Sequence, residues 1–204
     1  ANTELHSNWN PNIILFSGKS DHQNYLLELC KTVSGRTGIV TNFKLILDKK
    51  NSKPPLKKID QVVRDEMFQD LGIFPRQIKV DNIYKGITNI ASTFGFSGVE
   101  PNTIMMGWPK GLENSEEYSK MTQTLLHLDY NLLYLDFDRK TKFGNYSYVD
   151  FWWRETDSKN AEMMLNIARF IIASPKWNDR NIRVLFVNNN NVDVSIIEAK
   201  ISKL

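Results

Sequence analysis

Short apolar runs alternate with amphipathic helical segments along most of the chain, and this alternation constrains the fold more than any other feature. The runs that predict strands are 13–16, 38–47, 77–81, 103–106, 132–136, 148–153 and 182–187. Apolar residues recur at helical spacing over 22–34, 56–70, 83–94, 115–127 and 160–173. Strands that alternate with helices are joined by crossover connections, which produce a mostly parallel sheet with helices on both faces.

The sequence therefore predicts a doubly wound α/β fold. We expect the strands at 13–16 and 103–106 to lie side by side at the switch point, where the direction of winding reverses. The segment 138–147 breaks the alternation and predicts a loop. We expect a first α/β lobe over 9–137, and we expect 148–204 to continue the sheet or to begin a second lobe.

Composition excludes several classes of protein. No run approaches the roughly 18 apolar residues that a membrane-spanning helix needs. The net charge of +3 is only mildly basic and forms no dense stripe, so we expect no nucleic-acid partner. The single cysteine, Cys30, lies among apolar residues and is predicted to be a buried hydrophobe rather than a nucleophile.

The sequence offers no convincing catalytic constellation, so we expect a protein that is not an enzyme. His6, His22 and His127 lack the spacing of metal ligands, and the motifs G-x-S-x-G and G-x-G-x-x-G are absent. Asp136 and Asp138 follow a strand and could hold a cation, but they are equally suited to capping a loop. We predict no metal site.

The stretch FSGKSD, residues 16–21, ends the first predicted strand with Gly-Lys-Ser, which is the tail of a P-loop. The full P-loop needs a second glycine five positions before Gly18, so that backbone N–H groups can surround the phosphates. Ile13 occupies that position. The simplest interpretation is therefore a tight turn from strand to helix, built from small residues.

An anion site, or a site for ATP or another adenine nucleotide, is the alternative interpretation, because ligands of doubly wound sheets bind beyond the carboxyl ends of the strands. Its candidate residues are Ser17, Gly18, Lys19, Ser20, Gly107, Trp108 and Lys110. They would supply glycines for close backbone approach, lysines for phosphate charge and an indole for stacking. Gly107 is also expected to end its strand where a side chain would clash, and Trp108 to cover the end of the sheet. Without such a site, no cofactor is expected.

Residues 48–58, DKKNSKPPLKK, carry five lysines against one aspartate, together with two prolines that block helix and sheet. One interpretation is a solvated loop. The other is contact with anionic lipid headgroups through Lys49, Lys50, Lys57 and Lys58, since each lysine near such a surface adds on the order of 1 kcal/mol.

Two tryptophans end the predicted strand at 148–153. Trp152 and Trp153 are neighbours on a strand, so their side chains point to opposite faces. Either both belong to the core, or one packs inward and the other faces a partner or a second lobe. We take both as candidate interface residues and expect weak self-association through this region.

Three stretches carry a family resemblance: WNPNIILFSG at 9–18, GVEPNTIMMGWPKG at 98–111 and VDFWW at 149–153. In this order, over 9–187, they resemble the cytosolic C-terminal domain of cation–chloride cotransporters, within the amino acid–polyamine–organocation transporter group. The chain departs from the family at Asp157-Ser158-Lys159, where relatives often carry Asp-Gly-Gly.

The resemblance implies a non-catalytic domain on the cytoplasmic side of the membrane that tunes the parent's symport of chloride with sodium or potassium. It also implies a homodimer and contact with the parent's transmembrane domain. The α/β lobes of that family are similar to universal stress proteins, some of which bind ATP. The alternative function is therefore an adenine-nucleotide sensor of the universal-stress-protein kind.

Overall fold

The computed structural model describes residues 10–18, 23–35, 37–48, 72–95, 98–109, 111, 114–143, 146–153, 158–186, 193, 195 and 198–199. The predicted helix at 56–70 lies outside these residues. The chain divides into two compact units, one of residues 10–138 and one of residues 1–9 and 139–204, and each unit is described by itself. Among the helices described, none combines the length and the hydropathy of a segment that crosses a bilayer.

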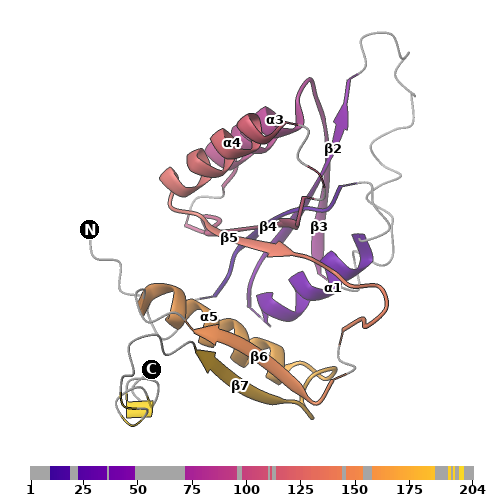
Figure 1. Cartoon of the computed structure of the whole chain (residues 1–204). Coiled ribbons are helices and arrows are strands. Elements are labelled where there is room, and N and C mark those ends of the chain that lie inside the picture. Colours follow the sequence, from indigo (N-terminus) through magenta and orange to yellow (C-terminus); the bar gives the residue numbers. More distant parts are fainter. Residues whose placement is uncertain are drawn as a thin grey trace. The chain divides into compact units, whose positions relative to one another are not determined.

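The first unit is built on a five-stranded parallel sheet in the order β3-β2-β1-β4-β5 (Figure 1). Its strands are β1 (Ile13–Phe16), β2 (Val40–Leu47), β3 (Ile73–Val80), β4 (Thr103–Gly107) and β5 (Asn131–Leu135). Ile13 pairs with Val40 on one side and with Thr103 on the other. This order is that of a doubly wound sheet with its switch point between β1 and β4, so the predicted fold class and the predicted neighbours are confirmed.

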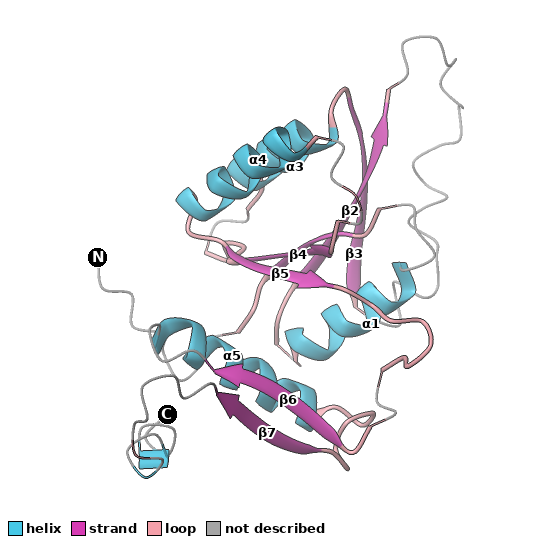
Figure 2. Ribbon diagram, in the orientation of Figure 1, coloured by secondary structure: helices cyan, strands magenta, loops and turns pink. Residues whose placement is uncertain are grey.

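Helices cover both faces of this sheet (Figure 2). The helix α1 (Gln23–Ser34) contacts β1, β2 and β4, whereas α3 (Ile83–Thr93) contacts β2 and β3, and α4 (Ser115–His127) contacts β5. The reason is the composition of the strands: all four residues of β1 are buried, so each face of the sheet needs a cover.

Alternate residues of the strands supply two cores. Phe16 and Met106 pack with Ile87, Met121 and Leu125 in the core under α3 and α4. The strand residues that alternate with these point to the opposite face of the sheet, where they are buried on the side of α1. Cys30 of α1 is fully buried there, as predicted. Burial also raises the pKa of the Cys30 thiol, which keeps it protonated.

Two asparagines tie the amino ends of the central strands together. The backbone N–H of Asn12 donates to Oδ1 of Asn102 (3.0 Å), and the amide of Asn102 donates to the carbonyl of Asn10 (3.1 Å). Oδ1 of Asn12 in turn accepts from the backbone N–H of Ile39 (3.2 Å) at the entry to β2. These bonds fix the alignment of β1 with β4 and β2, and they give Asn102 of the GVEPNTIMMGWPKG stretch a structural role.

Asn82 fixes the two helices of the other face. Its Oδ1 caps α3 by accepting from the N–H of Lys85 (3.1 Å). Its amide nitrogen donates to both carboxylate oxygens of Glu117 on α4, at 3.1 and 3.0 Å. The side chain thus links the first turn of α3 to the first turn of α4.

The observed elements differ from the predicted ones mainly at β3, which begins at Ile73 rather than at residue 77. Pro75 lies inside this strand. A proline removes a donor from the ladder, but β3 is at the edge of the sheet formed by the described strands, where the loss is tolerated. The other predicted boundaries lie within two residues of the observed ones.

The second unit contains a βαβ arrangement of β6 (Tyr148–Trp153), α5 (Ser158–Ala173) and β7 (Asn181–Phe186). The strands β6 and β7 pair in parallel as a separate two-stranded sheet, in which Asp150 is opposite Arg183 and Trp152 is opposite Leu185. Parallel neighbours need a crossover, and α5 supplies it. Exposure alternates along β6, as expected for a strand with one covered face.

Candidate functional site

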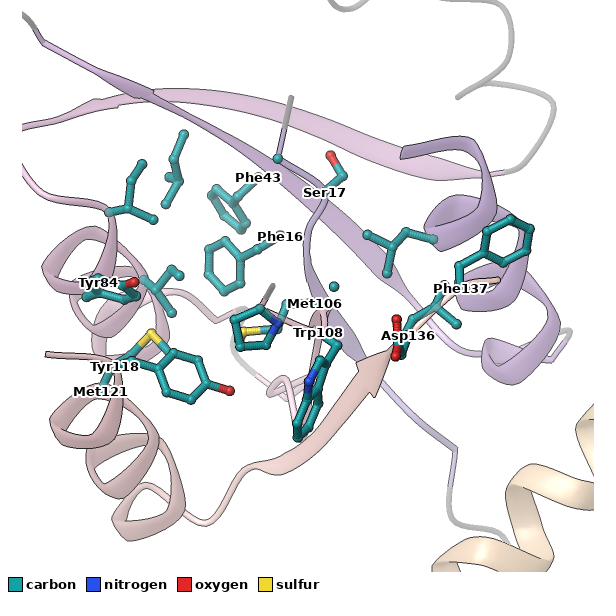
Figure 3. Close-up of a pocket in the computed structure, with 18 residues that line it drawn as sticks. Phe16, Ser17, Phe43, Tyr84, Met106, Trp108, Tyr118, Met121, Asp136 and Phe137 are labelled. Carbon is teal, nitrogen blue, oxygen red and sulfur yellow. The ribbon is translucent and has the colours of Figure 1, made fainter. Parts of the chain in front are cut away.

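A cavity of about 500 Å³ lies at the carboxyl ends of β1 and β4, which is the switch point of the sheet (Figure 3). It is lined by Phe16, Ser17, Gly18, Leu26, Phe43, Leu45, Ile83, Tyr84, Ile87, Met106, Gly107, Trp108, Pro109, Tyr118, Met121, Leu135, Asp136 and Phe137. Tyr84, Tyr118 and Met121 come from the side of α3 and α4, and Asp136 and Phe137 lie across from them (Figure 3). All of these residues belong to the first unit.

Four of the predicted site residues meet in this cavity. Ser17 and Gly18 follow β1, while Gly107 and Trp108 follow the body of β4, and all four line the same space. The predicted meeting of the two loops is therefore present in the structure. Lys19, Ser20 and Lys110 lie outside the described residues, as do the lysines of 48–58.

The two glycines of the site differ in what they require. Gly18 has φ of +61°, a left-handed conformation that favours glycine, although a Cβ there would meet nothing within 4 Å. At Gly107, φ is not in that region, and a Cβ would meet only Cδ1 of Leu26 at 3.8 Å, an ordinary contact. The expectation that a side chain would clash at Gly107 is therefore wrong.

The described lining is mostly aliphatic and aromatic, and its single formal charge is the carboxylate of Asp136. Tyr118 adds a hydroxyl whose pKa is raised chiefly by burial, so it stays neutral. Such a lining suits an apolar ligand and offers no described cation to a phosphate. Among the residues that the structure describes, no three side chains are grouped to hold a metal ion.

Trp108 lies at the rim of the cavity and is 54% exposed. Its backbone N–H donates to the carbonyl of Leu135 (2.8 Å), which fixes the chain where β4 ends. Its indole meets the ring of Tyr134 edge-on, with centroids 5.6 Å apart. The indole covers the end of the sheet only in part, because about half of its surface remains free to contact a ligand.

Ser17 is 2% exposed, and its Oγ has no hydrogen-bond partner within the described part of the chain. A buried hydroxyl without a partner costs about 1–3 kcal/mol relative to an apolar group of the same shape. The Ser17→Ala variant is therefore expected to be more stable: its free energy of unfolding, measured by urea denaturation, should exceed that of the wild type by about 1 kcal/mol. Ser34→Ala is the control, because the fully buried Ser34 hydroxyl donates to the carbonyl of Lys31 (3.0 Å), and this variant is expected to be destabilised. If Ser17→Ala is instead less stable than the wild type, the Ser17 hydroxyl has a hydrogen-bond partner in solution.

The outer face of β6 and β7 carries the predicted interface residues. Trp152 is 67% exposed, whereas Trp153 is partly buried, so the interpretation that placed both in the core is wrong for Trp152. Arg183 donates to both carboxylate oxygens of Asp150, at 2.7 and 2.8 Å, and stacks over the ring of Tyr148 at 4.2 Å.

This hydrogen bonding holds the pKa of Asp150 below its ordinary value of 3.8. The Asp150–Arg183 pair therefore contributes to stability above pH 3.8, and it loses this contribution as the pH falls through the lowered pKa of Asp150.

Sequence reasoning missed the wall of the cavity that comes from α3 and α4, and it missed Phe137. Tyr84 and Tyr118 occupy helical positions that predict only an inward-facing side chain, and nothing local distinguishes a core position from a cavity wall. A signal did exist for Asp136, since it ends the predicted strand at 132–136, and ligands of doubly wound sheets bind beyond such carboxyl ends.

Comparison with known proteins finds a solved structure with a similar fold. No model of a protein family matches the chain, and no curated protein matches it. Among solved structures, the chain is similar to the crystal structure of the cytoplasmic domain of a prokaryotic cation chloride cotransporter. The two chains are 15% identical and superpose with a TM-score of 0.69, over 96% of this chain and 73% of that one. This chain therefore shares the α/β fold of a domain from the same family that its three sequence stretches resemble.

Proposed function

We propose that this chain is a non-catalytic, cytosolic regulatory and dimerisation domain of a cation–chloride cotransporter. The proposal is supported by the structural likeness over 96% of the chain to a domain of that family, which the sequence stretches had indicated independently. Asn102 supports it further, because this residue of the resembling stretch holds the central strands in alignment. The domain acts on transport through its contacts with a second copy and with the parent's transmembrane domain.

The experiment tags the chain at its own locus in the cells that produce it. We expect the tag in the membrane fraction after an alkaline carbonate wash, on a protein much larger than 23.7 kDa. Chloride uptake that depends on sodium or potassium should change when the domain is deleted, after correction for the amount of transporter in the membrane. A tagged protein that is soluble and of about the mass of this chain would overturn the proposal.

The lysines of 48–58 are proposed to contact the cytoplasmic membrane surface. Vesicles that contain anionic lipid should bind the domain at low salt, and binding should weaken in high salt because the charges are screened. Reversing the charge of Lys49, Lys50, Lys57 and Lys58 should abolish this binding in vesicle sedimentation. Lys120→Glu on the exposed face of α4 is the control. Equal binding to neutral vesicles would contradict the proposal.

An adenine-nucleotide sensor is the second candidate function. The observation in its favour is that Ser17, Gly18, Gly107 and Trp108 line one cavity at the switch point. The rings of the lining could hold the base, but the described lining supplies no positive charge for the phosphates. Titration calorimetry with ATP and with AMP, repeated on Gly18→Val, tests this candidate. Heat with the wild type that is lost in the variant would support it, and absence of heat at millimolar nucleotide would exclude it.

A further inference from the structure

We propose that the cavity at the carboxyl ends of β1 and β4 binds a neutral, mostly apolar ring compound, with Trp108 at its rim as the residue that recognises it. This inference goes beyond the proposed regulatory function, which assigns no ligand to this space. It does not depend on that function, because it follows from the lining of the cavity alone.

The size and lining of the cavity indicate the class of ligand. Sites for small molecules are commonly clefts of about 300–1,000 Å³, mainly apolar and with a few placed polar groups. The present cavity has about 500 Å³, and Phe16, Phe43, Met106 and Met121 line its inner part. These side chains also belong to the core of the first unit, so the inner wall of the cavity is formed by the apolar core. A ligand that enters it exchanges water for aliphatic and aromatic carbon.

The charge and the polar groups of the lining restrict the ligand further, to neutral compounds. An anion buried without a partner is strongly disfavoured, and Asp136 is the one charged residue in the described lining. The Oγ of Ser17 has almost no accessible surface, so a ligand in the cavity gains no hydrogen bond from it. Trp108 offers a half-exposed indole at the rim, against which a flat ring can stack.

The test compares two naphthalenes that share a ring system and differ in charge: 2-naphthol, which is neutral at pH 7, and 2-naphthoate, which is an anion. Methyl-labelled methionine reports binding by NMR, because Met106 and Met121 line the cavity while Met163 and Met164 lie on α5 of the other unit. We expect saturable shifts of Met106 and Met121 with 2-naphthol, and at least tenfold weaker binding of 2-naphthoate. The signals of Met163 and Met164 should stay in place.

Variants link the binding to the named residues. Trp108→Ala should weaken 2-naphthol binding at least fivefold without loss of folding. Trp152→Ala, an exposed tryptophan of the other unit, should leave it unchanged. Absence of shifts at Met106 and Met121 at millimolar 2-naphthol would overturn the proposal, as would equal binding of 2-naphthoate. Binding of ATP in preference to 2-naphthol would overturn it in favour of the nucleotide site.

Discussion

Replacing Gly38 by alanine should lower the free energy of unfolding of the first unit by about 2–3 kcal/mol, which is the upper part of the range for overpacked sites. A Cβ at this position would collide with the backbone carbonyl oxygens of Ser34 and of Pro11, the second at 2.5 Å. Both oxygens belong to the backbone and cannot rotate away. Gly38 also donates its N–H to the carbonyl of Ser34 (3.0 Å), so the close approach is part of how the chain leaves α1 and enters β2.

Gly107→Ala is the matched control, because it is the same substitution at a site where the new methyl group meets only Leu26. Its free energy of unfolding should stay within about 0.5 kcal/mol of the wild type or rise slightly, since alanine restricts the unfolded chain. Urea denaturation followed by far-UV circular dichroism measures both variants. If both substitutions change the free energy of unfolding equally, the clash with the backbone oxygens is not the reason why glycine is needed at position 38.

The architecture of the first unit was predictable because burial on both faces leaves a strong local mark. The run Ile13–Phe16 has no polar residue, which is typical of a central parallel strand. The start of β3 was not predictable in the same way, because Pro75 argues against a strand unless that strand is known to be at an edge. Edge position depends on the order of strands, which is a property of the whole fold.

The candidate site was predictable only where it is made of loops at the switch point. Topology places the loops after β1 and β4 together, and this was enough to find Ser17, Gly18, Gly107 and Trp108. The cavity wall on the side of α3 and α4 was not predictable, although Tyr84 and Tyr118 of these helices line it. Their helical positions indicate which way they face, but not whether the space in front of them is filled.

The two tryptophans of β6 show the same limit. Strand alternation predicts that Trp152 and Trp153 face opposite ways, and the structure confirms this: one is 67% exposed and the other partly buried. Alternation does not say which of them is covered, because that depends on tertiary packing. The position of Trp152 on the exposed face is therefore a property of the tertiary structure.

Replacing Trp152 by alanine should weaken the proposed self-association of the domain at least tenfold, which corresponds to about 1.4 kcal/mol. Trp152 is 67% exposed on the outer face of β6, and Tyr148 and the Asp150–Arg183 pair lie on the same face. A large ring that is buried on association is the kind of residue that dominates interface energies. Since Asp150 and Arg183 already satisfy each other, the face presents aromatic surface without an unpaired charge from this pair. Sedimentation velocity over a concentration series measures the dissociation constant.

Trp108→Ala is the control for this experiment, because Trp108 is 54% exposed and lies on the other unit. It should leave the dissociation constant unchanged while weakening 2-naphthol binding, whereas Trp152→Ala should do the opposite. The two variants thus separate an association surface from a ligand site within one chain. A wild-type domain that stays monomeric at high micromolar concentration would contradict autonomous pairing. An equal loss of association in both variants would show that exposed aromatic surface in general, rather than the face of β6, drives it.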